Sequence, residues 1–181
     1  MDMYPSFQLE LARQRQRELP AAEQPRGELL YLRQLGAGDR EALSRAFSRL
    51  SPLSRYWRYS SAKADLAHAD LDRLTDLDPP RSDALGAFRT SDDELVGVVE
   101  YAAREATAAP ELAVVVVDDW QRRGVGTVLA NLIIERARTA RHSLLHAHVL
   151  ANNYTGLRLA QRLGFTAAAH DDLFIHYQLP L

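Results

Sequence analysis

The chain has 181 residues and a formal net charge of -2, with 46% hydrophobic and 25% charged residues. This composition favours one globular domain, and the near-neutral charge gives no general electrostatic reason to bind nucleic acid or an anionic membrane. The lack of cysteine excludes disulfides, thiolate metal ligands and a cysteine nucleophile. No apolar run approaches the roughly 20 residues that span a bilayer, and the first ten residues lack the order of a secretory signal. We therefore expect a cytoplasmic protein without a metal.

Two parts of the chain differ in their patterning. Residues 1–27 are interpreted as an N-terminal extension, because a stretch of helix formers at 9–19 is followed by Pro20 and Pro25. From residue 28 to residue 181 the pattern is regular and predicts one domain.

The predicted elements of this domain follow one another as strands with helices interspersed. Strands are expected at 28–35, 84–89, 94–102, 111–117, 143–150 and 173–179, and helices at 39–50, 53–59, 64–74 and 152–163, with a further helix after a loop at 121–127. Asp39 is a candidate helix cap. The order predicts an α/β (α+β) sheet domain rather than a doubly wound one.

The loop from residue 121 to residue 127 has the character of a phosphate site. A valine-rich buried strand precedes it and an amphipathic helix follows it, so the free amides and dipole of a helix N-terminus face the loop. Gly124 and Gly126 let the backbone come close to a ligand, and Arg122 and Arg123 add positive charge. A P-loop is excluded because its lysine is missing, and a dinucleotide fingerprint lacks its third glycine, which is Leu129 here. A tight turn without a ligand is the remaining alternative.

Two motifs together resemble those of the GNAT superfamily of N-acetyltransferases. The run Gln121-Arg122-Arg123-Gly124-Val125-Gly126-Thr127 is similar to the Q/R-x-x-G-x-G/A signature that cradles the pyrophosphate of acetyl-CoA. The run from Asn153 to Gly164-Phe165 is similar to the family's second motif, in which the asparagine bonds the pantetheine arm. The resemblance implies a GNAT fold, with a mixed, mostly antiparallel sheet of about six or seven strands flanked by helices. It also implies acetyl-CoA as the acyl donor, held by residues 121–127 and Asn153.

A narrower resemblance covers residues 47–56, 71–78 and 111–126, which look like the catalytic domain of bacterial Pat-type protein lysine acetyltransferases. In those enzymes a glutamate at the position of Glu111 acts as general base, through water. The alternative for Glu111 is a solvated strand end after Pro110, and Glu100 is a rival base that could instead pair with an arginine. Such a base has a clear task, since about 0.1% of a lysine amine is neutral at pH 7.4.

The resemblance also implies where the thioester oxygen lies. In GNAT enzymes two strands splay apart, and a backbone N–H near Val116–Val117 should meet this oxygen. The tyrosine that many relatives supply as general acid is replaced by Ala160, and Tyr154 is a weak substitute.

Three functions stay open at this point. The Pat-like pattern favours a protein lysine as acceptor, a small amine such as an antibiotic or polyamine is the alternative, and a non-catalytic acyl-CoA-binding domain is the third. An open acceptor groove would favour protein, and a closed acidic pocket would favour a small cation. His146 and His148 share one strand face but have no third metal ligand, so packing is preferred for them. A homodimer formed through the final strand is one option.

Overall fold

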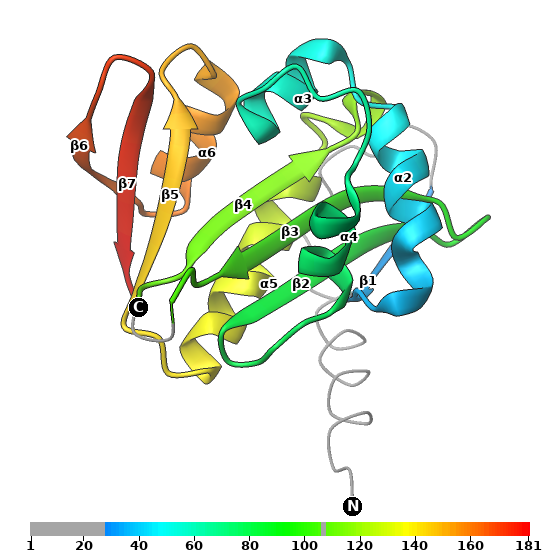
Figure 1. Ribbon diagram of the computed structural model, residues 1–181, viewed down its shortest axis with the longest axis horizontal. Coiled ribbons are helices and arrows are strands. Elements are labelled where there is room, and N and C mark those ends of the chain that lie inside the picture. Colours follow the sequence, from blue (N-terminus) through cyan, green and yellow to red (C-terminus); the bar gives the residue numbers. More distant parts are fainter. Residues whose placement is uncertain (1–27, 106–107) are drawn as a thin grey trace, which may run out of the picture.

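The computed structural model describes residues 28–105 and 108–181 (Figure 1). The predicted N-terminal extension, residues 1–27, lies outside the described residues, so the boundary at residue 28 stays a prediction. The helical elements are η1 (Ala37–Asp39), α2 (Arg40–Ser48), α3 (Pro52–Tyr59), α4 (His68–Thr75), η2 (Asp118–Trp120), α5 (Val125–Thr139) and α6 (Tyr154–Arg162). The strands are β1 (Leu30–Gln34), β2 (Ser82–Arg89), β3 (Leu95–Ala102), β4 (Glu111–Val116), β5 (Leu144–Leu150), β6 (Thr166–His170) and β7 (Phe174–Pro180).

The seven described strands form one sheet in the order β1-β2-β3-β4-β5-β7-β6. All neighbouring pairs are antiparallel except β4 and β5, which are parallel. This is the mixed, mostly antiparallel sheet flanked by helices that the family resemblance implied, so the predicted fold is confirmed.

One face of the sheet is covered by α5, which crosses behind β2 and β3 in Figure 1. Its predicted apolar stripe is buried there, with Leu129, Ile133 and Ala137 all without exposed surface, and each large side chain contributes about 1.5–3 kcal/mol by leaving water. A Cβ at Gly97 of β3 would lie 3.0 Å from the Leu129 side chain. The helix therefore packs closely on the sheet at Gly97, where any added Cβ would require the Leu129 side chain to shift.

The opposite face is covered by α2 and α4, which lie in front of the sheet (Figure 1). Leu43, Phe47 and Leu74 from these helices are buried against it. The helix α3 begins at Pro52 after Ser51, whose hydroxyl accepts the hydrogen bond of the Ser54 amide at 3.2 Å, and it ends at Ser60 in the left-handed conformation. This short helix is placed beside the opening described next.

The sheet divides between β4 and β5. The two parallel strands share a single register pair, Glu111 with His146, and then diverge toward α3 and α6, which lie on the two sides of the opening (Figure 1). The backbone groups of β4 beyond Leu112 are consequently not used by a neighbouring strand on this side. The opening is the feature that positions the site.

Four details differ from the sequence-based predictions. The third helix begins at His68 rather than near residue 64, and β6 was not predicted, since none of its five residues is buried. Asp39 precedes α2, but its carboxylate accepts hydrogen bonds from the Gly36 amide and from Arg33 instead of capping that helix. The final strand β7 lies between β5 and β6, so it has no free edge for a homodimer.

Candidate active site

The loop before α5 is shaped for an anion. Gly124 precedes the helix in the left-handed conformation, with φ of 84°, and Arg122 is also left-handed, with φ of 58°. Glycine at the N-cap has no side chain that could satisfy the first free amides of the helix, those of Val125, Gly126 and Thr127. Free amides and the dipole at a helix N-terminus favour an anion such as a phosphate group, so the loop stays the candidate phosphate site.

Gly126 gives independent support for a ligand at this loop. A Cβ built at Gly126 would meet its nearest neighbour, the Val116 side chain, at 3.6 Å, which is an ordinary contact. The protein's own packing therefore does not require a glycine at the second position of the helix, where glycine costs stability relative to alanine. A ligand that approaches the backbone closely would require it.

Neighbouring residues fix the loop in place. The Gln121 side-chain amide donates to the Val116 carbonyl at 3.0 Å and to the Ser54 hydroxyl at 3.1 Å. Arg123 stacks over Trp120, with its guanidinium carbon 4.9 Å from the ring centre. Arg122 is exposed beside it. Gln121 thus supports the loop from below, while the two arginines provide positive charge around it.

The turn η2 before this loop is tied to α3. Asp118 accepts hydrogen bonds from the Ser51 amide at 2.9 Å and from the hydroxyls of Ser51 and Ser54 at 2.7 and 3.0 Å. Burial opposes ionisation of this carboxyl, but the hydrogen bonds outweigh it and lower the pKa of Asp118. The carboxylate therefore joins the start of α3 to the strand–loop junction.

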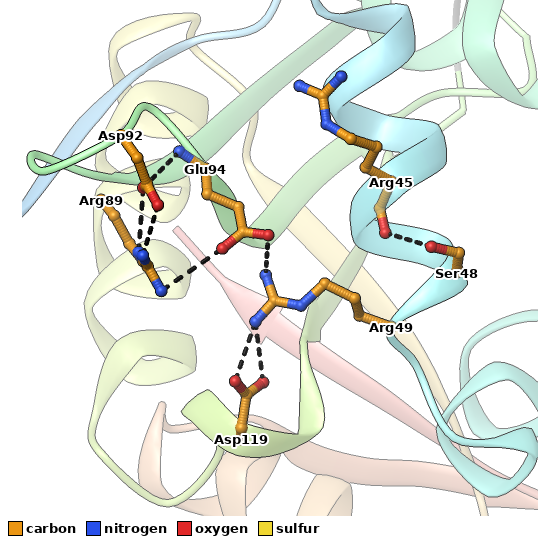
Figure 2. A network of polar contacts seen from close by, with 7 residues as sticks. All are labelled: Arg45, Ser48, Arg49, Arg89, Asp92, Glu94 and Asp119. Carbon is orange, nitrogen blue, oxygen red and sulfur yellow. Dashed lines mark hydrogen bonds and ion pairs between the residues drawn. The ribbon is translucent and has the colours of Figure 1, made fainter.

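A second polar network ties η2 to α2 and to the β2–β3 turn. Arg49 lies between Glu94 and Asp119, at 2.9 Å from each carboxylate (Figure 2). Arg89 contacts Glu94 from the other side and pairs with Asp92. These are partly exposed contacts of modest individual strength, but together they connect three segments around the base of the glycine loop.

The backbone amides of β4 differ in their availability. The Val117 N–H donates to the Val96 carbonyl of β3 at 2.9 Å. Since N–H groups alternate in direction along a strand, those of Val116 and Val114 point to the other side, toward the opening. Of the two valines expected to meet the thioester oxygen, we retain Val116.

A cavity of about 560 Å³ occupies the opening between the diverging strands. It is lined by the end of α3, by β4 and β5, and by α6, whose contribution includes Asn153 and Gly156. Asn153 precedes α6, and its side-chain oxygen accepts the Gly156 amide hydrogen bond at 2.9 Å. The structure records no bond from the Asn153 Nδ2 to another described residue, so this donor can serve a ligand in the cavity.

Glu111 lies at the narrow end of the same cavity. Its side chain is 35% exposed, and its Oε1 is 3.4 Å from Nδ1 of His148. Glu100, the rival base, is 2% exposed and pairs with both Arg58 and Arg73. Both arginines contact Oε1 of Glu100, and its Oε2 is buried, so this carboxylate is not accessible to an amine, whereas that of Glu111 is open to the cavity.

Several cavity residues escaped the sequence analysis. Arg73, Arg104 and His176 line the cavity, and only the topology brings them together with Glu111. Trp57 and Arg58, from the end of α3, also line the cavity. Tyr154 is 70% exposed and does not line it, so nothing here supports Tyr154 as general acid.

The described residues contain no group of three or more potential metal ligands. They also contain no helix that is long and apolar enough to cross a membrane.

A glycine loop with free helix amides, two diverging strands and a cavity with a carboxylate are the features expected of an acyl-CoA-dependent N-acetyltransferase. The model of the acetyltransferase (GNAT) family matches residues 45–165, which is more than half of the chain. The protein belongs to this family.

Known proteins resemble the chain in sequence and in fold. It is 32% identical over 148 residues to "Acetyltransferase PA5475" of Pseudomonas aeruginosa, covering 81% of this chain and 80% of that protein. The GNAT domain of S. lividans PAT superposes with a TM-score of 0.77 at 24% identity, covering 88% of this chain and 100% of that domain. Spermidine N-acetyltransferase from Vibrio cholerae, crystallised with CoA and spermine, gives 0.66 at 16% identity, covering 83% and 95%. These two structures support the fold.

Proposed function

We propose that this enzyme transfers the acetyl group of acetyl-CoA to a protein lysine, by direct attack in a ternary complex with Glu111 as general base. The observation that carries the proposal is the position of Glu111. Its carboxylate is partly exposed, faces the cavity and stands where β4 and β5 begin to diverge. A carboxylate there can accept a proton from an amine that enters the cavity, directly or through one water.

The other candidate site residues would each bind a different part of acetyl-CoA. The amides of residues 124–127 would hold the diphosphate, with Arg122 and Arg123 adding charge, and Gln121 would keep the loop in place. The Nδ2 of Asn153 would bond the pantetheine arm. The N–H of Val116, which points into the opening, would meet the thioester oxygen as negative charge develops on it, and one such donor contributes about 3 kcal/mol.

The charge of the cavity bears on the acceptor. Arg58, Arg73 and Arg104 line it, and Arg104 makes no ion pair within the described part of the chain. Glu111 is the one lining carboxylate among the described residues. A polyamine with several positive charges would be repelled by this surface, whereas a lysine brings one positive charge that is lost on deprotonation. The lining therefore favours a lysine over a polycation.

The test is acetyl-CoA-dependent CoA release with lysine peptides, spermidine and small amines, for the wild type, Glu111→Gln and the exposed control Glu135→Gln. We expect the peptides to be the best acceptors. Glu111→Gln should lose about 10²–10⁴-fold in kcat while still binding acetyl-CoA, and Glu135→Gln should match the wild type. Release with spermidine alone would replace the lysine assignment with a small amine. Tight acetyl-CoA binding without release for any amine would indicate a non-catalytic binding domain.

A further inference from the structure

Glu111 is connected to two histidines and an aspartate. The Glu111 carboxylate lies 3.4 Å from Nδ1 of His148. His148 on β5 and His176 on β7 are directly opposite each other in the antiparallel ladder, so their side chains stand on the same face of the sheet. Their rings meet edge to face, with centres 4.7 Å apart.

Asp171 fixes the far end of this chain of contacts. Its Oδ2 is 2.9 Å from Nε2 of His176, and its Oδ1 accepts the amide hydrogen bonds of Leu173 and Phe174 at 2.8 and 2.7 Å. The hydrogen bond from His176, together with those two amides, lowers the pKa of Asp171 to about 2. Asp171 is therefore a fixed anion that holds the His176 ring, and the His176 ring holds that of His148.

Packing alone does not explain this arrangement. The His148 side chain is 35% exposed and lines the cavity, as does His176. Imidazole is the side chain that gains and loses a proton most readily near neutral pH. A neighbour with this property offers the base a route for the proton that it collects in every turnover.

The other charged groups of the cavity stand on different elements. Arg58 and Tyr59 come from α3, Arg73 from α4, and Arg104 from the segment after β3. Arg58 and Arg73 both pair with Glu100. Burial raises the pKa of Tyr59. The cavity around His148 therefore holds the cations of other elements as well as the Glu111 carboxylate.

We propose that His148 is a positioning residue that takes the proton from Glu111 and passes it to solvent, with His176 and Asp171 holding its ring in place. This inference rests on the proposed function of Glu111 as base.

In the proposed reaction, the ammonium proton of the acceptor moves to the Glu111 carboxylate, and the neutral amine attacks the thioester carbon. The C–N bond forms, the C–S bond breaks and the thiolate leaves. Glu111 then gives its proton to Nδ1 of His148, and the imidazolium loses one from Nε2 to water. The second proton of the amine is released as the amide forms and neutralises the thiolate.

The first experiment measures kcat and KM against pH for the wild type, His148→Gln and the same-strand control His146→Gln. Glutamine keeps polar contacts but cannot carry a proton. We expect His148→Gln to lower kcat by about tenfold or more at pH 8, with the KM for acetyl-CoA unchanged, and to remove the imidazole step from the acidic side of the profile. His146→Gln should follow the wild type. An unchanged kcat and profile in His148→Gln would overturn the proposal.

A second experiment uses His148→Ala with free imidazole. The small side chain leaves space at the cavity wall, so added imidazole should restore turnover in proportion to its unprotonated fraction. Assays without the amine and with His146→Ala measure any direct acetylation of imidazole. A variant that melts like the wild type but is not rescued would contradict a proton-carrying role.

The variant Asp171→Asn tests the proposed proton relay while leaving the proposed base Glu111 unchanged. We expect kcat to fall by a smaller factor than in His148→Gln, again with an unchanged KM for acetyl-CoA, because the His176 ring is less firmly held. If the wild type shows no amine-dependent CoA release at all, the proposed function fails. If the wild type is active and all three variants keep its pH profile, the relay alone fails.

Discussion

The side-chain amide of Gln121 donates a 3.0 Å hydrogen bond to the carbonyl of Val116, which joins the glycine loop to the end of β4. The same amide reaches the Ser54 hydroxyl at 3.1 Å. One side chain therefore sets the distance between the proposed diphosphate site and the proposed thioester site.

Replacing Gln121 by alanine should weaken both ends of this junction. The Val116 carbonyl loses a partner, so the free energy of unfolding should fall by about 1 kcal/mol. We expect the Kd for acetyl-CoA, measured by calorimetry, to rise about fivefold, which corresponds to a similar free energy. Gln161→Ala, at an exposed position of α6, is the control, and equal Kd values for the two variants would contradict this role for Gln121.

Gly126→Ala should separate ligand binding from stability. The new methyl group meets only ordinary contacts in the protein, at 3.6 Å or more, and alanine favours a helix, so stability should stay within about 1 kcal/mol of the wild type or rise. Acetyl-CoA binding should weaken by about tenfold or more, because the methyl group occupies the approach to the helix amides. Gly38→Ala, where nothing lies within 4 Å of the added atom, should change neither quantity. Unimpaired binding by Gly126→Ala would place the diphosphate elsewhere.

Amide substitution should lower the stability of the fold at Glu100 and the catalytic activity at Glu111. Glu100→Gln leaves Arg58 and Arg73 without their buried anion, and breaking a buried pair costs about 3–5 kcal/mol. Glu111→Gln removes a partly exposed carboxylate and should leave the melting temperature close to that of the wild type. Thermal melts and kcat on the same samples distinguish them. A stable but inactive Glu100→Gln would make Glu100 the base after all.

Asp171 should make stability depend on pH in the acidic range. Its pKa is lowered from 3.8 to about 2 in the folded protein by the His176 hydrogen bond and by the amides of Phe174 and Leu173. A lowered carboxyl pKa stabilises the fold above the unfolded value, and this contribution is lost as the pH falls through the folded value. We expect Asp171→Asn to be less stable than the wild type in urea at pH 6, and the gap to close between about pH 4 and pH 2. Asp172→Asn, an exposed neighbour, should show no such convergence, and a pH-independent gap for Asp171→Asn would refute the linkage.

The sequence predicted those parts of the molecule that have local signals. The valine-rich run at 111–117 became β4, and the amphipathic pattern after the glycine loop became α5, because burial of an apolar face dictates both patterns. The strand β6 had no such signal: its sequence, TAAAH, is exposed throughout, and it is a strand only because β7 offers an edge.

The chemistry of the cavity depends on tertiary contacts that no local pattern encodes. Glu111, His148 and His176 are separated by 37 and 28 positions, and the divergence of β4 from β5 brings them together. The sequence showed His148 as one of two histidines on a strand face, and packing was the preferred interpretation. The contact of His148 with His176 could have been predicted only if the pairing of β5 with β7 had been known. The pairing of Glu100 with an arginine was anticipated as an alternative, but the choice of Arg58 and Arg73 was not.

The single register pair between β4 and β5 acts as the vertex of an angle. The four strands from β1 to β4 form one arm, and β5, β7 and β6 form the other. If the arms turn relative to one another, points far from the vertex are displaced most and points beside it least. Glu111 is at the vertex, whereas Asn153 is near the wide end. Opening the angle to admit a large donor would thus move the groups that grip it while leaving the proposed base almost stationary.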